Sequence, residues 1–229
     1  MIRMVVFDMA GTTVNEDNVV YKTLQKSINE NGFNFSLDQV MEQGAGREKM
    51  QAVRSILDAY AHIEDNELTD KIYRHFIIHL TEAYKNMPVL PQPGVIDLFQ
   101  ILKQENILVV LNTGYNRETA QNLLEKLGWR RRIEFDELIS ASDVKANRPD
   151  PDMIWLAMKK FGIENAKEVI KVGDSIIDIE EGRNAGCRLN VGITTGAHNF
   201  KQLQTANPDY IINNLLELSP IISSLTASH

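Results

Sequence analysis

The residues best suited to chemistry in this chain stand at the ends of short apolar runs. Asp8 ends the run "VVFD", Thr113 follows "ILVVLN", and Asp174 follows "EVIKVG". In open parallel sheets, ligands bind beyond the carboxyl ends of the strands, so these side chains are expected to meet at one edge of a sheet. An aspartate at a strand end is most often a turn or capping residue. The prediction of a site rests on the occurrence of all these residues in this order along the chain.

These residue types fit the handling of a phosphorus centre. A carboxylate such as Asp8 can act as a nucleophile, and with Asp174 it can hold Mg²⁺, a hard ion that prefers oxygen ligands. A bound metal would offset repulsion between the nucleophile and an anionic substrate. Thr113 and the N–H groups of the turn at 9–11 can donate to phosphoryl oxygens. Arg148, in "KANRPDP", adds a permanent cation with a planar donor fork.

The elements that must position these residues are strands alternating with helices, which predicts an α/β fold with a parallel sheet. The segment 116–128 reads as a helix with Asn116 as its N-cap and Gly128 as its C-terminal stop. The segment 151–162 also reads as a helix, because it starts with Pro and ends with Gly. The expected strands are the apolar runs at 4–7, 107–112, 168–173, 188–194 and 210–212.

Residues 15–88 show no convincing strand and are expected to be helical. In "LTDKIYRHFIIHLTEAYKNM", Leu68, Ile72 and Phe76 begin an apolar series that recurs every four residues, as on one face of a helix. The prolines of "MPVLPQPG" end this segment. We therefore expect a core domain of residues 1–14 plus 89–229 and an inserted helical domain of residues 15–88.

The composition narrows the function classes. The chain has 229 residues and a formal net charge of -7, and no basic tail concentrates charge, which disfavours a nucleic-acid partner. The single cysteine, Cys187, excludes an internal disulfide and fits a reducing compartment. No apolar run approaches the length of a membrane span, and no signal peptide is evident. A cytoplasmic protein without a membrane partner is expected.

The chain resembles the haloacid dehalogenase (HAD) superfamily of phosphoryl-transfer enzymes. The matches, in order, are "DMAGTTV", Asn112-Thr113-Gly114, Arg148 and "GDSIID". The resemblance implies a Rossmann-like core with an all-helical cap domain. It also implies that Asp8 is the nucleophile and that Mg²⁺ is held by Asp8, the Ala10 carbonyl and Asp174, with Asp178 in support.

Ala10 departs from the common pattern of that superfamily. Most members carry an aspartate there, which protonates the leaving oxygen and later activates water. "DMAGTTV" resembles instead the first motif of phosphonatases (phosphonoacetaldehyde hydrolases), which break a C–P bond with the help of a cap lysine that forms a Schiff base. These enzymes also carry Arg at the position of Arg148. The resemblance implies that further residues contact a small phosphonate or phosphate substrate, namely Ala10, Gly11, Thr12, Gly46, Arg47, Asn112 and Gly114.

Lys49 is the candidate cap lysine. It follows Gly46 by three residues and lies in line with Val53 and Ile56 on the apolar face of a predicted helix. Partial desolvation and the positive end of the helix dipole would both favour the neutral amine, the form that attacks an aldehyde. Lysines beside apolar stripes also commonly extend to water, and phosphonatases have a histidine where this chain has Ala52. A plain substrate-contact role for Lys49 is therefore the alternative.

Three functions remain open at this point. The first is Mg²⁺-dependent cleavage of phosphonoacetaldehyde or a related 2-oxoalkylphosphonate. The second is hydrolysis of a small phosphomonoester without the usual acid. The third is a non-catalytic protein that binds a phospho-ligand. The resemblance to phosphonatases also implies a homodimer.

Overall fold

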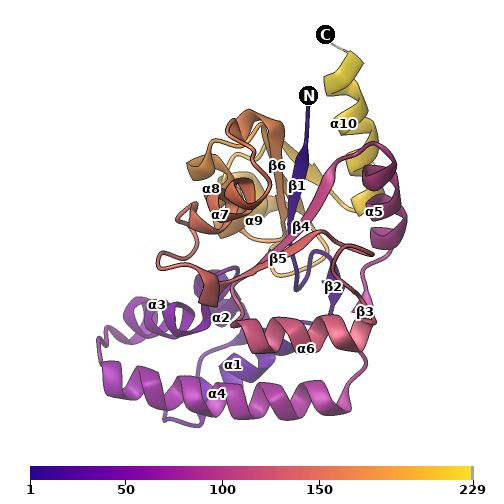
Figure 1. The fold of residues 1–229 in the computed structure, drawn as a ribbon. Coiled ribbons are helices and arrows are strands. Elements are labelled where there is room, and N and C mark those ends of the chain that lie inside the picture. Colours follow the sequence, from indigo (N-terminus) through magenta and orange to yellow (C-terminus); the bar gives the residue numbers. More distant parts are fainter. Residues whose placement is uncertain (228–229) are drawn as a thin grey trace.

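The computed structural model describes residues 1–227 and consists of a central sheet, flanking helices and a separate group of helices below them (Figure 1). The sheet has six strands in the order β5-β4-β1-β6-β7-β8, and every neighbouring pair is parallel. Its strands are β1 (Met4–Asp8), β4 (Leu108–Thr113), β5 (Glu137–Ser140), β6 (Val169–Gly173), β7 (Leu189–Ile193) and β8 (Tyr210–Ile212).

Strand β1 lies at the point where the strand order reverses. The chain runs outward from β1 to β4 and β5 on one side and to β6, β7 and β8 on the other. In such sheets the crevice at the carboxyl ends beside this point is the usual ligand site. The register places Asp8 directly beside Asn112 of β4. The polar residues that follow the central strands are thereby brought to one edge, as predicted.

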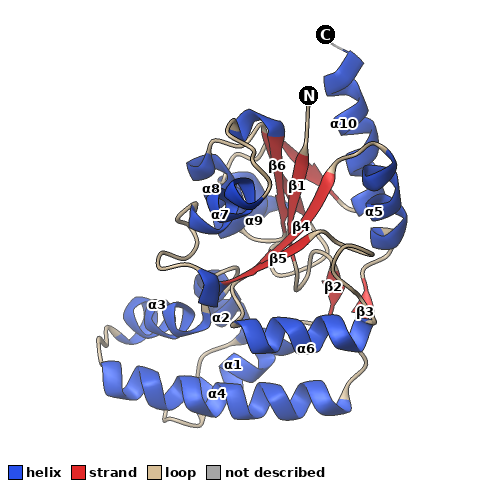
Figure 2. Cartoon of the chain, in the orientation of Figure 1, coloured by secondary structure: helices blue, strands red, loops and turns tan. Residues whose placement is uncertain are grey.

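Alternate residues of β1 bury against different helices, as the two-residue period of a strand requires. Val5 and Phe7 belong to the core cluster that includes residues of α5 and α10, whereas Met4 and Val6 pack with residues of α7. Figure 2 shows the helices arranged on both sides of the sheet. The helices of this part are α5 (Val95–Gln104), α6 (Arg117–Leu127), α7 (Asp152–Lys160), α8 (Ile176–Ala185), α9 (Phe200–Thr205) and α10 (Leu218–Ala227), with 3₁₀ turns η1 (Ala141–Asp143), η2 (Ala166–Glu168) and η3 (Leu215–Glu217).

Four helices fill the chain between β2 (Val14–Asn15) and β3 (Leu90–Pro91), and these two short strands pair antiparallel. The pair therefore holds the entry and the exit of the helical segment side by side. Buried residues of these helices belong to the same core cluster as Val5 and Phe7, so the apolar interior is continuous with one face of the sheet. The helices are α1 (Val19–Asn29), α2 (Leu37–Gly44), α3 (Lys49–Ala61) and α4 (Asn66–Asn86).

The two predicted ends of α6 are confirmed. The Asn116 side chain accepts a hydrogen bond from the amide of Thr119 at the start of α6, and Gly128 ends that helix in the left-handed conformation. Cys187 is buried. No helix among the described residues is both long enough and apolar enough to cross a membrane.

One strand differs from the sequence-based expectations. Strand β5 was not predicted, because "ELIS" is only four residues long and follows a charged stretch. On the neighbouring helix α7, Trp155 is 51% exposed, and its indole N–H donates to the carbonyl of Ala185.

Candidate active site

Three carboxylates meet at the carboxyl edge of β1 and β6. Asp8 ends β1, Asp174 follows β6, and Asp178 lies in the first turn of α8. One oxygen of each lies within 4.8 Å of the others, and all three side chains are buried. Such a buried set of hard oxygen donors fits a divalent cation.

In this cluster the negative charges of the carboxylates exceed the positive charges of the neighbouring cations. Burial and the neighbouring carboxylates raise the pKa of Asp8, against the effect of Arg148, and they raise the pKa of Asp174 well above its usual range. Asp178 behaves differently, because Arg148 and Lys171 outweigh its burial and lower its pKa. A cation beside Asp8 and Asp174 would relieve the repulsion between them.

Arg148 is fully engaged by protein acceptors. Its Nη1 donates to Oδ1 of Asp8 at 2.7 Å and to the Gly46 carbonyl at 3.3 Å. Its Nη2 donates to the backbone and side-chain oxygens of Asn112 at 3.0 and 2.6 Å, and its Nε donates to Glu181 at 2.9 Å. The five N–H groups of a guanidinium thus have five acceptors. In this arrangement Arg148 orients the Asp8 carboxylate rather than offering free donors.

Glu181 and Lys171 complete this network and were missed from the sequence. The Glu181 carboxylate accepts from Nδ2 of Asn112 at 2.8 and 3.0 Å. The Lys171 ammonium donates to the Asn112 side chain at 2.9 Å and to Asp178 at 2.8 Å. Two sequence signals could have found them: a lysine inside the apolar run "EVIKVG", and a glutamate three residues after Asp178 on the same helix face.

The turn after Asp8 is tightly built. Gly11 has φ +84°, and a Cβ there would lie 2.3 Å from Oδ2 of Asp174. Its N–H was expected to be free for a ligand, but it donates to the carbonyl of Val14 at 2.9 Å. The amides of Met9 and Ala10 remain as the candidate donors of this turn.

Two threonines expected near the ligand lie in this region. Thr12 Oγ1 donates to Oδ1 of Asp174 at a long 3.5 Å. Thr113 is buried at the end of β4, and its hydroxyl accepts from the amide of Tyr115 at 3.2 Å. The hydroxyl hydrogen of Thr113 therefore stays available to an acceptor beside Asn112.

The loop between α2 and α3 packs directly on the sheet edge. Besides its contact with Arg148, Gly46 donates its amide to the Tyr21 hydroxyl. A Cβ on Gly46 would approach Oγ of Ser175 to 2.2 Å, and one on Gly114 would approach the Arg47 carbonyl to 2.5 Å. These two glycines permit the close approach. The Arg47 side chain turns back to α2, where its Nε donates to the Gln43 carbonyl at 2.9 Å, while the backbone carbonyl of Arg47 faces Gly114.

Lys49 is the first residue of α3 and is 6% exposed. Its Nζ donates to the Arg47 carbonyl at 2.8 Å and lies 5.6 Å from the ring centre of Tyr21 and 5.3 Å from that of Tyr115. Burial lowers the pKa of Lys49, although the negative charge of Asp8 partly counteracts this. The buried helix face carries Ala52, Val53 and Ile56, as predicted.

A second set of buried polar side chains adjoins Tyr115 and includes Tyr84 and Glu16. The Tyr115 and Tyr84 hydroxyls are 2.8 Å apart, and the Tyr84 hydroxyl donates to Oε2 of Glu16 at 3.0 Å. Glu16 is 2% exposed, and it also accepts from the amide of Val20. Sequence reasoning did not single out Glu16, Tyr84 or Tyr115 as functional residues. Tyr84 lies on α4, Glu16 just before α1 and Tyr115 just after β4, so only tertiary packing brings them together.

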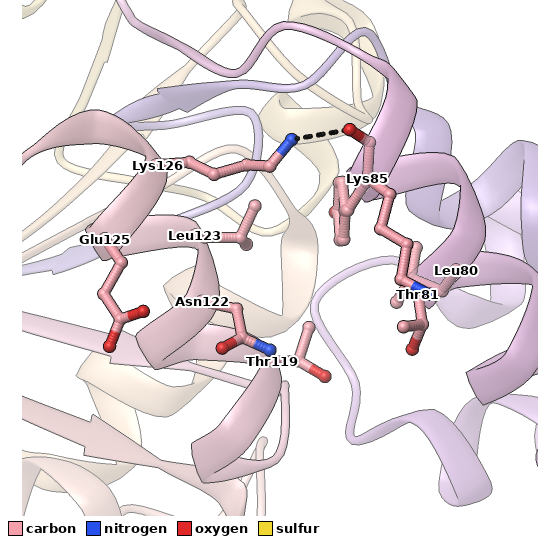
Figure 3. Close-up of a pocket in the computed structure, with 9 residues that line it drawn as sticks. Leu80, Thr81, Lys85, Thr119, Asn122, Leu123, Glu125 and Lys126 are labelled. Carbon is pink, nitrogen blue, oxygen red and sulfur yellow. Dashed lines mark hydrogen bonds between the residues drawn. The ribbon is translucent and has the colours of Figure 1, made fainter.

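A hollow of about 430 Å³ lies between α4 and α6 (Figure 3). Lys126 crosses one end of it and donates to the Lys85 carbonyl. None of the predicted site residues lines this hollow, so it is separate from the carboxylate cluster. Its lining residues are Leu80, Thr81, Tyr84, Lys85, Thr119, Asn122, Leu123, Glu125 and Lys126.

Known proteins share this fold and sequence pattern. Residues 5–191 match the family model of the haloacid dehalogenase-like hydrolases. A phosphonoacetaldehyde hydrolase of Parabacteroides distasonis is 30% identical over 85% of this chain and 76% of its own length. A probable phosphatase, IndB, of Dickeya dadantii is 26% identical over 94% of this chain and 91% of its own length.

A solved structure of a phosphonoacetaldehyde hydrolase-like protein from Oleispira antarctica superposes with a TM-score of 0.82 at 21% identity. The match covers 97% of this chain and 92% of that one. This similarity shows a shared fold. The family match extends over most of the chain, including the strand ends that carry the site, and argues against a non-catalytic binding protein. The chain is therefore an enzyme and belongs to the haloacid dehalogenase-like hydrolase family.

Proposed function

We propose that this enzyme cleaves the C–P bond of phosphonoacetaldehyde or a related 2-oxoalkylphosphonate. The observation that carries the proposal is the buried amine of Lys49 in an otherwise closed site that has an alanine at position 10. A buried lysine with a lowered pKa is suited to Schiff-base chemistry. An ester phosphatase needs an acid for its leaving oxygen, and Ala10 cannot supply one. Residues 15–88 serve as the cap over the core in this proposal.

In the proposed reaction, Nζ of Lys49 attacks the substrate aldehyde, and loss of water gives an iminium. A carboxylate oxygen of Asp8 then attacks phosphorus while the C–P bond breaks. The electrons of that bond pass to carbon and are stabilised as an enamine on the lysine nitrogen. Water hydrolyses the resulting aspartyl-phosphate to release phosphate. Protonation at carbon and hydrolysis of the imine release acetaldehyde and restore the amine.

We further propose Mg²⁺ as the metal of this site, with Asp8, Asp174 and the Ala10 carbonyl as ligands and Asp178 in support. The buried carboxylates Asp8, Asp174, Asp178 and Glu181 outnumber the cations Arg148 and Lys171, which fits an additional positive charge. When bound, the metal supplies charge compensation for an anionic substrate. Arg148 holds Asp8 in orientation, and the amides of Met9 and Ala10 and the Thr113 hydroxyl donate to phosphoryl oxygens.

Borohydride trapping tests the proposal. The enzyme is incubated with phosphonoacetaldehyde and sodium borohydride, and the modified residue is located by peptide mass spectrometry. We expect loss of activity with one adduct on Lys49, and no adduct in Lys49→Arg. The exposed Lys201→Arg change serves as the matched control and should leave trapping intact. Phosphate release from phosphonoacetaldehyde by Lys49→Arg at the wild-type rate would contradict the proposal.

The second candidate is hydrolysis of a small phosphomonoester. Its support is the similarity to the probable phosphatase IndB, together with the contact between Lys49 and the Arg47 carbonyl, which a lysine used only to bind substrate would also make. Phosphate release from a panel of sugar phosphates and p-nitrophenyl phosphate, unaffected by Lys49→Arg, would favour this candidate.

A further inference from the structure

Glu16 is a fully enclosed carboxyl group that the proposed reaction leaves without a task. It lies just after β2, where the chain enters the helical segment, and its side chain turns inward. Burying a carboxyl group costs free energy unless it is neutral or well hydrogen-bonded. The preceding residue, Asn15, is exposed, so the chain passes close to the surface here. The side chain of Glu16 nevertheless points into the interior.

Two hydroxyl groups connect Glu16 to the aromatic ring that Lys49 contacts. Oε2 of Glu16 is 3.0 Å from the Tyr84 hydroxyl, which is 2.8 Å from the Tyr115 hydroxyl. Nζ of Lys49 lies 5.3 Å from the centre of the Tyr115 ring. The bond between the two tyrosines can run in either direction. The series can therefore carry a proton between Glu16 and the Tyr115 hydroxyl, the end of the series on the side of Lys49.

We infer that Glu16, acting through Tyr84 and Tyr115, supplies and recovers the proton that Lys49 requires when its imine forms and breaks. This inference rests on the proposed C–P cleavage. When the carbinolamine on Lys49 loses water, its C–O bond breaks and the nitrogen lone pair forms the C=N bond. The departing oxygen takes a proton from Tyr115, which is replaced from Tyr84 and finally from the Glu16 carboxyl. Water addition to the imine later runs the same transfers in reverse.

The other charged groups near Lys49 are already occupied. Asp8 is the proposed nucleophile, and the Glu48 carboxylate caps α3 by accepting from the amides of Met50 and Gln51. Arg148 has an acceptor for every N–H group. Glu16 also accepts from one amide of α1, that of Val20, but it is the carboxylate near Lys49 that is hydrogen-bonded to the tyrosine pair.

The environment of Glu16 suits this task. Burial raises its pKa to about 7, although the hydrogen bonds from Val20 and Tyr84 counteract part of the rise. Besides Tyr84, the titratable groups that face it are Lys49 from α3, Tyr115 after β4 and Tyr21 from α1. A group with such a pKa can both give and take a proton near neutral pH.

The hollow between α4 and α6 lies against one member of this series. Tyr84 is one of the residues that line the hollow. A buried acid–base group must exchange its proton with water when the net proton count of the cycle changes. In this inference Tyr84, which borders the hollow, is the member of the series nearest to such an exchange.

The test measures the rate of imine formation at Lys49 by borohydride trapping with phosphonoacetaldehyde as a function of pH. Glu16→Gln keeps an acceptor for Tyr84 but cannot supply a proton, and Tyr84→Phe interrupts the series. Tyr60→Phe and Glu42→Gln are the matched controls, because Tyr60 donates to Glu42 at 2.7 Å in the same helical segment, away from Lys49. Thermal unfolding of all four variants checks that they fold.

We expect Glu16→Gln and Tyr84→Phe to slow trapping by about 10²-fold near pH 7, and both controls to match the wild type. The wild-type rate should fall as pH rises through about 7, where Glu16 loses its proton, and Glu16→Gln should lose this fall. A purely electrostatic role of Glu16 predicts the opposite result, namely faster trapping in Glu16→Gln. A Glu16 carboxylate stabilises the ammonium form of Lys49, so its removal would free the amine. Unchanged or faster trapping in Glu16→Gln overturns the inference alone. Absence of any wild-type adduct on Lys49 overturns the proposed function and this inference together.

Discussion

Nη1 of Arg148 donates to Oδ1 of Asp8 at 2.7 Å, and both side chains are almost completely buried. The contact joins residues 140 positions apart, and it fixes one oxygen of the proposed nucleophile. The same guanidinium reaches Glu181, Asn112 and the Gly46 carbonyl. Arg148 therefore connects the Asp8 carboxylate, the neighbouring strand β4 and the loop between α2 and α3 through hydrogen bonds.

Arg148→Lys is expected to destabilise the protein although it preserves the charge. One ammonium cannot satisfy acceptors on Asp8, Asn112 and Glu181 together, and each buried acceptor left alone costs about 1–3 kcal/mol. We expect the free energy of unfolding, measured with urea, to fall by about 2–4 kcal/mol. The exposed pair Arg3–Glu168 offers the control, since Arg3→Lys should change it by less than about 1 kcal/mol. Equal effects of the two changes would refute this reading of Arg148.

Gly114→Ala is expected to loosen the packing of the loop between α2 and α3, part of the proposed cap, on the sheet edge. A methyl group there would lie 2.5 Å from the Arg47 carbonyl, a backbone atom that cannot move alone. We expect the Arg47–Lys49 loop to shift away from the sheet edge and Lys49 to react several times faster with acetic anhydride. Gly192→Ala, whose new methyl would meet only side-chain atoms at 3.3 Å or more, serves as the control. Unaltered labelling of Lys49 in Gly114→Ala would show that the close packing is not needed for closure.

Asp174→Asn is expected to abolish stabilisation by Mg²⁺. A metal bound only to the folded state stabilises the wild type by about 2.7 kcal/mol at about 100 times its dissociation constant. Replacing one carboxylate of the triad removes a charged ligand, so the thermal midpoint of Asp174→Asn should no longer respond to MgCl₂. The exposed Asp70→Asn change should respond like the wild type. If the thermal midpoint of Asp174→Asn responds to MgCl₂ as fully as that of the wild type, Asp174 is not a ligand of the metal.

The centre of the site could be predicted from the sequence, because its residues stand at strand ends. The contacts that depend on packing between distant segments could not be predicted. Asp8 and Asp174 could be placed together because parallel strands bring their carboxyl ends to one edge of the sheet. The contact of Glu16 with Tyr84 joins residues 68 positions apart through the packing of α1 on α4, which no local pattern encodes. Likewise, the engagement of every Arg148 donor depends on Glu181 and Asn112, and the sequence predicted only that a cation was present.

Ala10→Asp is expected to shift the enzyme toward ester hydrolysis. An aspartate two residues after the nucleophile could protonate an ester leaving oxygen, a contribution of about 10²-fold or more. We expect kcat/KM for p-nitrophenyl phosphate to rise relative to that for phosphonoacetaldehyde. Ala10→Asn is the control, because asparagine has nearly the same shape as aspartate but no titratable group. It separates the effect of acid catalysis from that of a larger side chain at position 10. A rise of the same size in both variants would contradict an acid role for the new carboxyl.

Glu16→Gln is expected to change the dependence of stability on pH. Burial raises the pKa of Glu16 from 4.5 to about 7, so the folded state holds this proton more tightly than the unfolded chain does. The stabilisation is complete below pH 4.5 and is lost as pH rises through about 7. The glutamine variant should therefore be the more stable protein at pH 8, by about 2–3 kcal/mol, with the difference shrinking toward pH 5. Urea unfolding at several pH values measures this, with Glu42→Gln as the comparison. A difference between Glu16→Gln and the wild type that does not vary from pH 5 to pH 8 would mean that Glu16 keeps an ordinary pKa despite its burial.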